Sequence, residues 1–106
     1  MKIVVTLPDE SVREITAQSG RSLMDNLRNA GIPVRAECGG AMACATCHVA
    51  VDPAWMDKVG KPGGEESDLL DNSDYLTPFS RLSCQIKLKD AMDGLKVTLQ
   101  LDAFEG

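Results

Sequence analysis

Four cysteines are spread unevenly along this chain, and their spacing constrains the fold more than any other feature of the sequence. Cys38, Cys44 and Cys47 follow one another at intervals of five and two residues, whereas Cys84 comes after a gap of thirty-six. Three thiolates from one loop and a fourth from a distant strand can enclose a cluster of two irons and two sulfides, because soft anionic donors support iron in both oxidation states. The spacing predicts that two remote segments meet around a shared metal cofactor.

The segment that carries the first three cysteines is built almost entirely of small residues. From Ala36 to Thr46 it contains alanines, a threonine and the pair Gly39 and Gly40, with no strong period. We therefore expect an irregular loop. Glycine lets the backbone approach a cofactor closely, so that N–H groups can point at its sulfurs and stabilise added negative charge.

Other uses of the cysteines fit the spacing less well. Structural zinc usually takes two close cysteine pairs, and here only Cys44 and Cys47 form one, so a structural zinc-binding module is the alternative from another functional class. The run from Cys44 to His48 matches the signature of covalent c-type haem, but this leaves Cys38 and Cys84 without a role and requires export. A thioredoxin-like dithiol requires Cys44 near a helix N-terminus, which this loop lacks.

Length and charge narrow the classes of function. With 106 residues, 43% hydrophobic and 25% charged, the chain fits a single domain over residues 1–106. A formal charge of −5 argues against nucleic acid, which requires clustered positive charge, and favours a partner with a basic surface. The first residues contain only a brief apolar run that ends at Pro8, so we expect neither a signal peptide nor a membrane span and predict a cytoplasmic location. As a separate expectation, the chain is predicted to be a monomer.

Local patterns predict a small α+β domain. Apolar and β-branched residues predict a hairpin over residues 2–7 and 12–16, and further strands are expected over 48–51, 82–88 and 96–101. Ser22 is expected to cap a helix that has Asp25 in its first turn and that packs Leu23, Leu27 and Ala30 on one face. Pro53 predicts a helical turn over residues 53–58, and residues 65–72 predict a short acidic helix. Strands at both ends of the chain imply a mixed sheet with packed helices.

At this point a family resemblance becomes specific. Residues 38–48 and 81–85 resemble the adrenodoxin and putidaredoxin family of ferredoxins, and the similarity extends over nearly the whole chain. Plant-type ferredoxins have four residues, not five, in the first gap. The resemblance implies a β-grasp fold, a [2Fe–2S] cluster bound by Cys38, Cys44, Cys47 and Cys84, and an electron-transfer protein that is not itself an enzyme.

The resemblance also implies partners. It predicts that a flavin-containing, NAD(P)H-dependent ferredoxin reductase reduces the cluster and that a cytochrome P450 accepts the electron. Relatives with the same cysteine spacing donate electrons to iron–sulfur cluster assembly instead, and this role is the alternative that keeps the cluster.

The acidic helix is the candidate docking surface. At about 100° per residue, Leu69 and Leu70 face inward while Asp68 and Asp71 face water. No Lys or Arg lies between Glu65 and Asp74, so these carboxylates either form a solvated face or steer a basic partner. The resemblance favours docking and implies that Asp68 and Asp71 contact both reductase and P450, with Glu65 beside them.

Three further residues are expected to couple the loop to this helix. Glu66 falls on the inward side of the helix, and Arg81 or His48 could supply its partner. In the resembling family a matching histidine and arginine link the cluster loop to the acidic helix, so His48 is interpreted as structural. The chain departs from the family in lacking a terminal aromatic residue, which leaves the docking roles of Phe104 and Met42 open. Gly64 stands at a position where an adrenodoxin-like member of the family would have another acidic residue.

Overall fold

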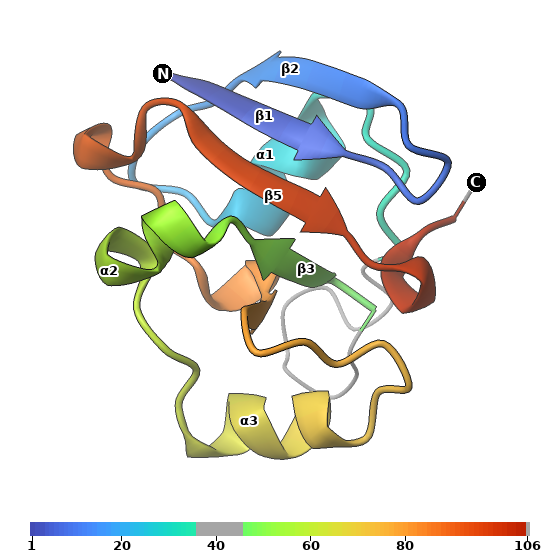
Figure 1. Ribbon diagram of the computed structural model, residues 1–106. Helices are drawn as coiled ribbons and strands as arrows, with labels where there is room; N and C mark the ends of the chain where they lie inside the picture. Colours follow the sequence, from blue (N-terminus) through green and yellow to red (C-terminus); the bar gives the residue numbers. More distant parts are fainter. Residues whose placement is uncertain (36–45, 106) are drawn as a thin grey trace.

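The computed structural model describes residues 1–35 and 46–105, in which a five-stranded sheet forms the centre of the molecule (Figure 1). The strand order is β2-β1-β5-β3-β4. Only β1 and β5 pair in parallel among these strands, so the prediction of a mixed sheet is confirmed. The strands are β1 (Lys2–Thr6), β2 (Val12–Thr16), β3 (His48–Val51), β4 (Ser80–Leu82) and β5 (Leu95–Leu99).

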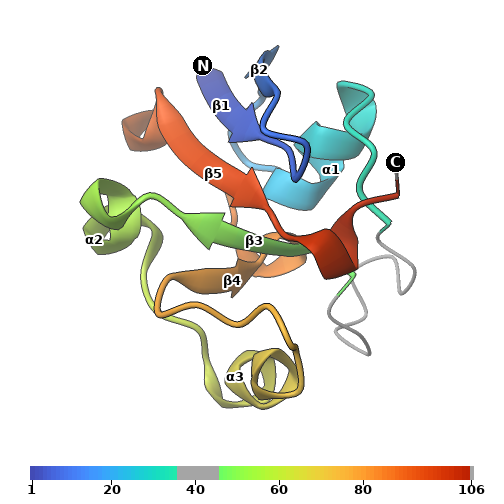
Figure 2. The ribbon, with the colours of Figure 1, turned by 45° about the vertical axis from the view of Figure 1, so that its right-hand side comes forward.

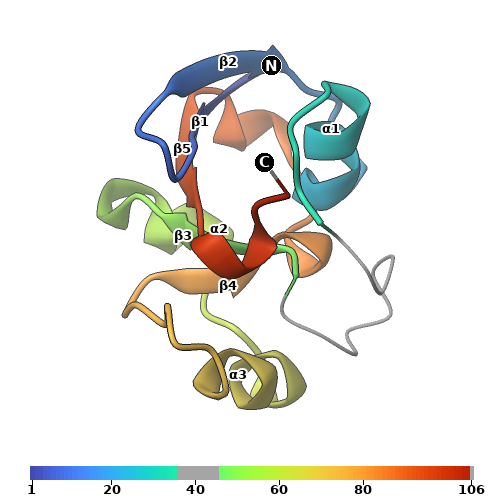
Figure 3. The same ribbon diagram turned by 90° about the vertical axis from the view of Figure 1, so that its right-hand side faces the viewer.

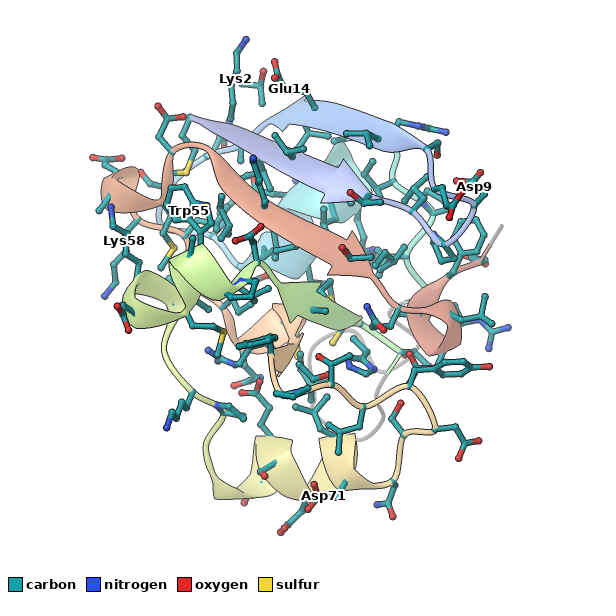
Figure 4. All side chains as sticks on the ribbon, viewed as in Figure 1. Lys2, Asp9, Glu14, Trp55, Lys58 and Asp71 are labelled. Carbon is teal, nitrogen blue, oxygen red and sulfur yellow. The ribbon has the colours of Figure 1, made fainter. Side chains whose placement is uncertain are left out.

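The first two strands form the predicted hairpin. Successive strand residues point to opposite faces of a sheet. Ile3, Val5 and Ile15 are therefore buried in the core. On the opposite face, the Nζ of Lys2 lies 3.0 Å from the Oε1 of Glu14, and both side chains project into solvent (Figure 4). The hairpin thus contributes one wall of the core and an exposed ion pair.

Helix α1 (Leu23–Asn29) covers one face of the sheet (Figures 1 and 3). It begins as predicted, because the Ser22 hydroxyl accepts a hydrogen bond from the Asp25 N–H at 3.1 Å. Leu23 and Leu27 are fully buried. The expectation for Ala30 is wrong: the helix ends before it, and Ala30 becomes the exposed C-cap residue ahead of Gly31, which has a φ of +80°.

Two short helices follow β3. Pro53 begins a 3-10 turn (Pro53–Trp55) that continues into α2 (Met56–Val59). The helical turn predicted over residues 53–58 is therefore confirmed. The acidic helix α3 (Gly64–Asp71) confirms the prediction over this segment. It lies beyond β4, the edge strand (Figure 2). The helices α1 and α3 therefore occupy different sides of the molecule.

The strand predicted over residues 82–88 is wrong beyond its first residue. β4 ends at Leu82, and a 3-10 turn (Ser83–Gln85) follows. The chain leaves the sheet here and pairs with the segment ahead of α1, where the N–H of Leu23 donates to the carbonyl of Ile86 at 2.8 Å. Ile86 and Leu88 are nevertheless buried. Burial of alternate residues thus reproduces a strand pattern without a strand.

The end of the described chain differs in a similar way. β5 ends at Leu99, two residues short of the prediction, and a 3-10 turn (Leu101–Ala103) follows because the N–H of Ala103 donates to the carbonyl of Gln100 at 3.0 Å. The expected turn between the last two strands contains a further 3-10 turn (Asp90–Met92). Within residues 1–35 and 46–105, no helix has the length and apolar character to cross a bilayer.

Candidate metal centre

Cys47 and Cys84 are brought together by the pairing of β3 with β4. Cys47 directly precedes β3, Cys84 lies in the turn after β4, and the register sets His48 opposite Leu82. Ser83 donates its N–H and its hydroxyl to the Cys47 carbonyl at 3.0 and 2.8 Å. Cys47 is fully buried, whereas Cys84 is partly exposed. One cysteine therefore comes from the core and the other from the rim.

The two thiols contact each other and do not form a disulfide. Hydrogen bonding with the Cys47 thiol, aided by the Gln85 amide, lowers the pKa of Cys84 to about 6. The same contact, together with burial, raises the pKa of Cys47. A thiolate is the form of cysteine that binds metal. The lowered pKa favours this form at Cys84, and the contact places a second candidate ligand, Cys47, beside it. The other two predicted ligands, Cys38 and Cys44, lie outside the described residues.

His48 is held by protein partners on both sides of its ring. Its Nε2 lies 2.6 Å from the Ser80 hydroxyl, and its Nδ1 lies 3.1 Å from the Oδ1 of Asp102. The Ser73 hydroxyl donates to the Oδ2 of Asp102 at 2.5 Å and lies 3.3 Å from the His48 Nδ1. His48 is fully buried in this network. Among the described residues, no three His, Cys, Asp or Glu side chains gather as a metal site.

Of the two partners offered for Glu66, the structure selects Arg81 and not His48. The Arg81 Nε donates to the Oε2 of Glu66 at 2.6 Å, and its Nη2 donates to the Oε1 at 3.2 Å. The same Oε2 accepts the N–H of Leu82 at 2.9 Å. Both charged residues are buried. His48 reaches the end of α3 instead, through Ser73 and Asp102.

Arg81 has further partners that fix the turn around Cys84. Its Nη1 donates to the carbonyls of Val59 and Gly60 at 3.1 and 2.8 Å, and its Nη2 lies 3.4 Å from the carbonyl of Gln85. The guanidinium therefore joins the segment before α3 to Gln85, the residue directly after Cys84. Because both charges are buried and satisfied, this junction is expected to be rigid.

The outer face of α3 has the predicted arrangement. Leu70 is buried and Leu69 is half-buried, whereas Glu65, Asp68 and Asp71 are exposed. Asp71 points away from the body of the protein (Figure 4). The wheel prediction is therefore confirmed for these side chains, while their role in docking stays a prediction.

The segment after β5 holds the chain on both sides of residues 36–45. Ahead of them, Pro33 accepts the N–H of Glu105 and Arg35 donates to the Ala103 carbonyl, each at 2.8 Å, and behind them Asp102 contacts His48. Phe104 is half-buried against the core. Met42 lies outside the described residues. Phe104 therefore packs against the core in this structure. Its side chain is not strongly exposed, so the structure does not support a docking role for it.

Several contributors to the site are absent from the sequence predictions, among them Ser80 and Ser83. Asp102 and Ser73 had no signal, because their partners are distant in sequence and lie outside any periodic face. Gln85 had a weak one, since it follows a predicted ligand directly. Its Nε2 donates to the Cys84 Sγ at 3.4 Å.

A family comparison decides what this site belongs to. The family described as "2Fe-2S iron-sulfur cluster binding domain" matches residues 7–89, which include both described cysteines and the turn around Cys84. The chain belongs to this family. It is a [2Fe–2S] ferredoxin of the adrenodoxin and putidaredoxin type, an electron carrier and not an enzyme, and its cofactor is the cluster.

Similar proteins agree with this assignment. The 2Fe-2S ferredoxin CtmE of Castellaniella defragrans is 43% identical over 100 residues, which cover 92% of this ferredoxin and 94% of CtmE. The mitochondrial adrenodoxin homolog of Saccharomyces cerevisiae is 38% identical over 99 residues, which cover 93% of this chain but only 58% of the yeast protein.

Solved structures extend the agreement to the fold. A crystal structure of a ferredoxin from Rhodopseudomonas palustris HaA2 has a TM-score of 0.91 and 39% identity, covering 97% of this ferredoxin and 99% of that chain. Putidaredoxin in its covalent complex with putidaredoxin reductase has a TM-score of 0.87 and 39% identity, covering 93% and 97%. The predicted β-grasp fold is therefore confirmed.

Proposed function

We propose that Cys38, Cys44, Cys47 and Cys84 bind the [2Fe–2S] cluster and that this ferredoxin passes single electrons from a flavin-containing, NAD(P)H-dependent ferredoxin reductase to a cytochrome P450. The cluster supplies the one-electron redox chemistry. The protein holds it, limits its exposure and presents it to partners. The observation that carries the proposal is the acidic outer face of α3, a helix that Glu66 joins to the backbone N–H of Leu82, two residues before Cys84.

The charge of α3 supports docking to a basic partner. Glu65, Asp68 and Asp71 are exposed, and no Lys or Arg stands within residues 65–74 to balance them. Unbalanced charge of one sign raises the rate of encounter with an oppositely charged surface, and salt weakens this effect. A carrier must also leave one partner to reach the next, which favours a small polar interface over a large apolar one.

The junction between α3 and the cluster ligand supports efficient transfer. Leu82, whose N–H binds Glu66, stands two residues before Cys84. Arg81 contacts both Glu66 and the carbonyl of Gln85, directly after Cys84. A partner seated on α3 is therefore fixed relative to the ligand turn. Putidaredoxin, a similar protein, has been crystallised in covalent complex with its reductase, which makes a reductase the first partner to test.

Reconstituted electron transfer tests the proposal. The holo-ferredoxin is mixed with an NADH-dependent ferredoxin reductase and a cytochrome P450 that accepts putidaredoxin-type ferredoxins, and P450 reduction is followed in stopped flow. Asp68→Asn combined with Asp71→Asn should leave the visible spectrum unchanged. We expect it to lower the second-order rate constant about tenfold at low ionic strength, with the difference shrinking as salt is added.

Asp57→Asn combined with Asp90→Asn is the matched control. Both residues are exposed, and the double substitution changes the net charge by the same amount. Asp57 lies on α2, and Asp90 lies in the 3-10 turn (Asp90–Met92) that contacts α2, so neither belongs to α3. Equal rates for the two double variants would remove α3 from the interface. Support of cluster assembly without support of any P450 would favour the alternative role, and a colourless protein containing zinc would overturn the ferredoxin ligand set.

A further inference from the structure

One side-chain hydrogen bond to a cysteine sulfur stands out in the described part of the site. The Gln85 Nε2 donates to the Cys84 Sγ at 3.4 Å, which is within hydrogen-bond range for sulfur. Gln85 is exposed, so its amide could otherwise be satisfied by water. Its contact with the sulfur therefore has to be explained by the position of the backbone.

The backbone of Gln85 is fixed from two directions. Its carbonyl accepts from the Arg81 Nη2 at 3.4 Å, and the 3-10 turn that contains it closes through the Ile86 N–H and the Ser83 carbonyl at 3.3 Å. Arg81 is itself held by the buried Glu66. The side-chain amide of Gln85 therefore starts from a fixed point directly next to Cys84.

A donor at this sulfur has a definite electrostatic effect. One-electron reduction adds negative charge to the cluster and to its thiolate ligands, and a hydrogen bond to a more negative acceptor is stronger. Such a donor stabilises the reduced state more than the oxidised state and raises the reduction potential. We propose that Gln85 is a positioning residue that raises the reduction potential of the cluster by donating its side-chain amide to Cys84. This inference rests on the proposed role of Cys84 as a ligand.

The surroundings of Gln85 give the bond a second property. Gln85 lines a hollow of about 330 Å³ together with Gly63, Gly64, Glu65, Glu66 and Arg81. A Cβ at Gly63 or Gly64 would meet nothing within 4 Å, so the first turn of α3 leaves this hollow open. Glu65 belongs both to the lining of this hollow and to the exposed face of α3, so we expect a partner seated on α3 to cover the hollow and exclude water from it. The bond then acts in a lower dielectric, which strengthens its effect on the potential.

The test measures the midpoint potential of the purified holo-ferredoxin by titration with redox dyes. Gln85→Met keeps the length and neutrality of the side chain but removes the donor. We expect the equilibrium constant for reduction to fall about tenfold, which for one electron corresponds to about 59 mV. Gln18→Met is the matched control, because Gln18 is exposed, follows β2, and is bonded through its backbone to Asn26 and not to a cysteine. Its potential should equal that of the wild type.

Gln85→Lys tests the opposite change in reduction potential. It keeps an N–H donor and adds a positive charge, so the potential should be equal to or higher than that of the wild type. A role confined to packing would move the potential of both variants in one direction. Resonance Raman spectra add an independent readout, since loss of the donor should raise the Fe–S(Cys) stretching frequency in Gln85→Met only.

The outcomes separate this inference from the proposed function. The inference is overturned if the equilibrium constant for reduction of Gln85→Met lies within twofold of that of the wild type. A midpoint potential below that of the wild type in both Gln85 variants overturns it as well. Should Gln85→Met fail to hold the cluster, the sign of the shift in Gln85→Lys decides. A ferredoxin that shows the expected shifts but does not reduce any P450 keeps the inference and loses the proposed acceptor. Retention of the complete cluster in Cys84→Ala overturns both.

Discussion

Replacing Glu66 by glutamine should destabilise this ferredoxin more than any single change of charge on its surface. The substitution keeps the shape of the side chain and removes its negative charge. Arg81 then remains buried without its counter-ion, and the N–H of Leu82 competes for a single carbonyl oxygen. The packing is nearly unchanged, so the effect isolates the charge.

The magnitude follows from the burial of the pair. Glu66 and Arg81 are 4% and 6% exposed, so solvent does not compensate the orphaned guanidinium. Breaking a buried ion pair by removing one partner costs about 3–5 kcal/mol. A domain near this size loses about 4 °C of melting temperature for each kcal/mol, which gives a fall of about 12 °C or more.

The assay is thermal loss of the visible absorption of the oxidised holo-ferredoxin at one fixed scan rate, since release of a cluster makes unfolding irreversible. Glu14→Gln is the matched control. It breaks the ion pair between Lys2 and Glu14, whose side chains are 66% and 57% exposed, and exposed pairs contribute about 0–1 kcal/mol. Its melting temperature should therefore stay within a few degrees of the wild type.

A fall for Glu66→Gln no larger than that for Glu14→Gln would refute the reasoning. A second variant checks the mechanism. Glu66→Leu combined with Arg81→Met removes both charges, so it should be less destabilised than Glu66→Leu alone, because no buried charge is left without a partner. A strictly additive double variant would show that the two side chains do not interact.

Three smaller perturbations test other parts of the structure. Cys84→Ala should abolish the visible absorption of the cluster, because the turn after β4 then offers no ligand, and an intact spectrum would contradict this. Ser22→Ala should cost about 1 kcal/mol in urea unfolding, since the N–H of Asp25 loses its cap. The pKa of Asp9 is lowered by its hydrogen bonds with Ser11. The stabilisation by this carboxylate is therefore present above the ordinary pKa of about 3.9 and is lost as the pH falls below it. The free energy of unfolding of Asp9→Ala should therefore differ from that of the wild type only above this pH.

Local rules in the sequence were sufficient for much of the fold. The hairpin, the cap at Ser22, the turn at Pro53 and the acidic helix depend on neighbouring residues, and each appears where it is predicted. Glu66 is a stronger case, because its place on the inner side of a helix is enough to require a buried cationic partner. Arg81 fills that requirement.

The sequence predictions fail where residues are buried in the alternating pattern of a strand but do not belong to one. Ile86 and Leu88 are buried at alternate positions, but their backbones pair with the segment ahead of α1 and not with the sheet. No pattern within residues 82–88 could reveal a partner some sixty residues away in the sequence. The contacts of His48 fail to appear in the sequence for the same reason, since Asp102 and Ser73 reach it from two other segments.

The site is therefore only partly predictable. The cysteine spacing predicts the ligands as a set, which stays a prediction, and the family comparison agrees with the cofactor that this set implies. The donor from Gln85 depends on the 3-10 turn that the sequence presents as a strand. A side chain on a strand would point to one face of the sheet, whereas the turn places the amide next to the sulfur of the residue before it.

The central place of β5 also determines when the protein can take up its cofactor during synthesis. This strand lies between β1 and β3, so the ribosome must release Leu99 before the sheet can close. At about 5–20 residues per second, roughly 3 to 10 s pass between the emergence of Cys47 and that event. Cys47 therefore leaves the ribosome well before the strand that completes the sheet beside it. We expect the full enclosure of the cofactor to wait for the release of β5.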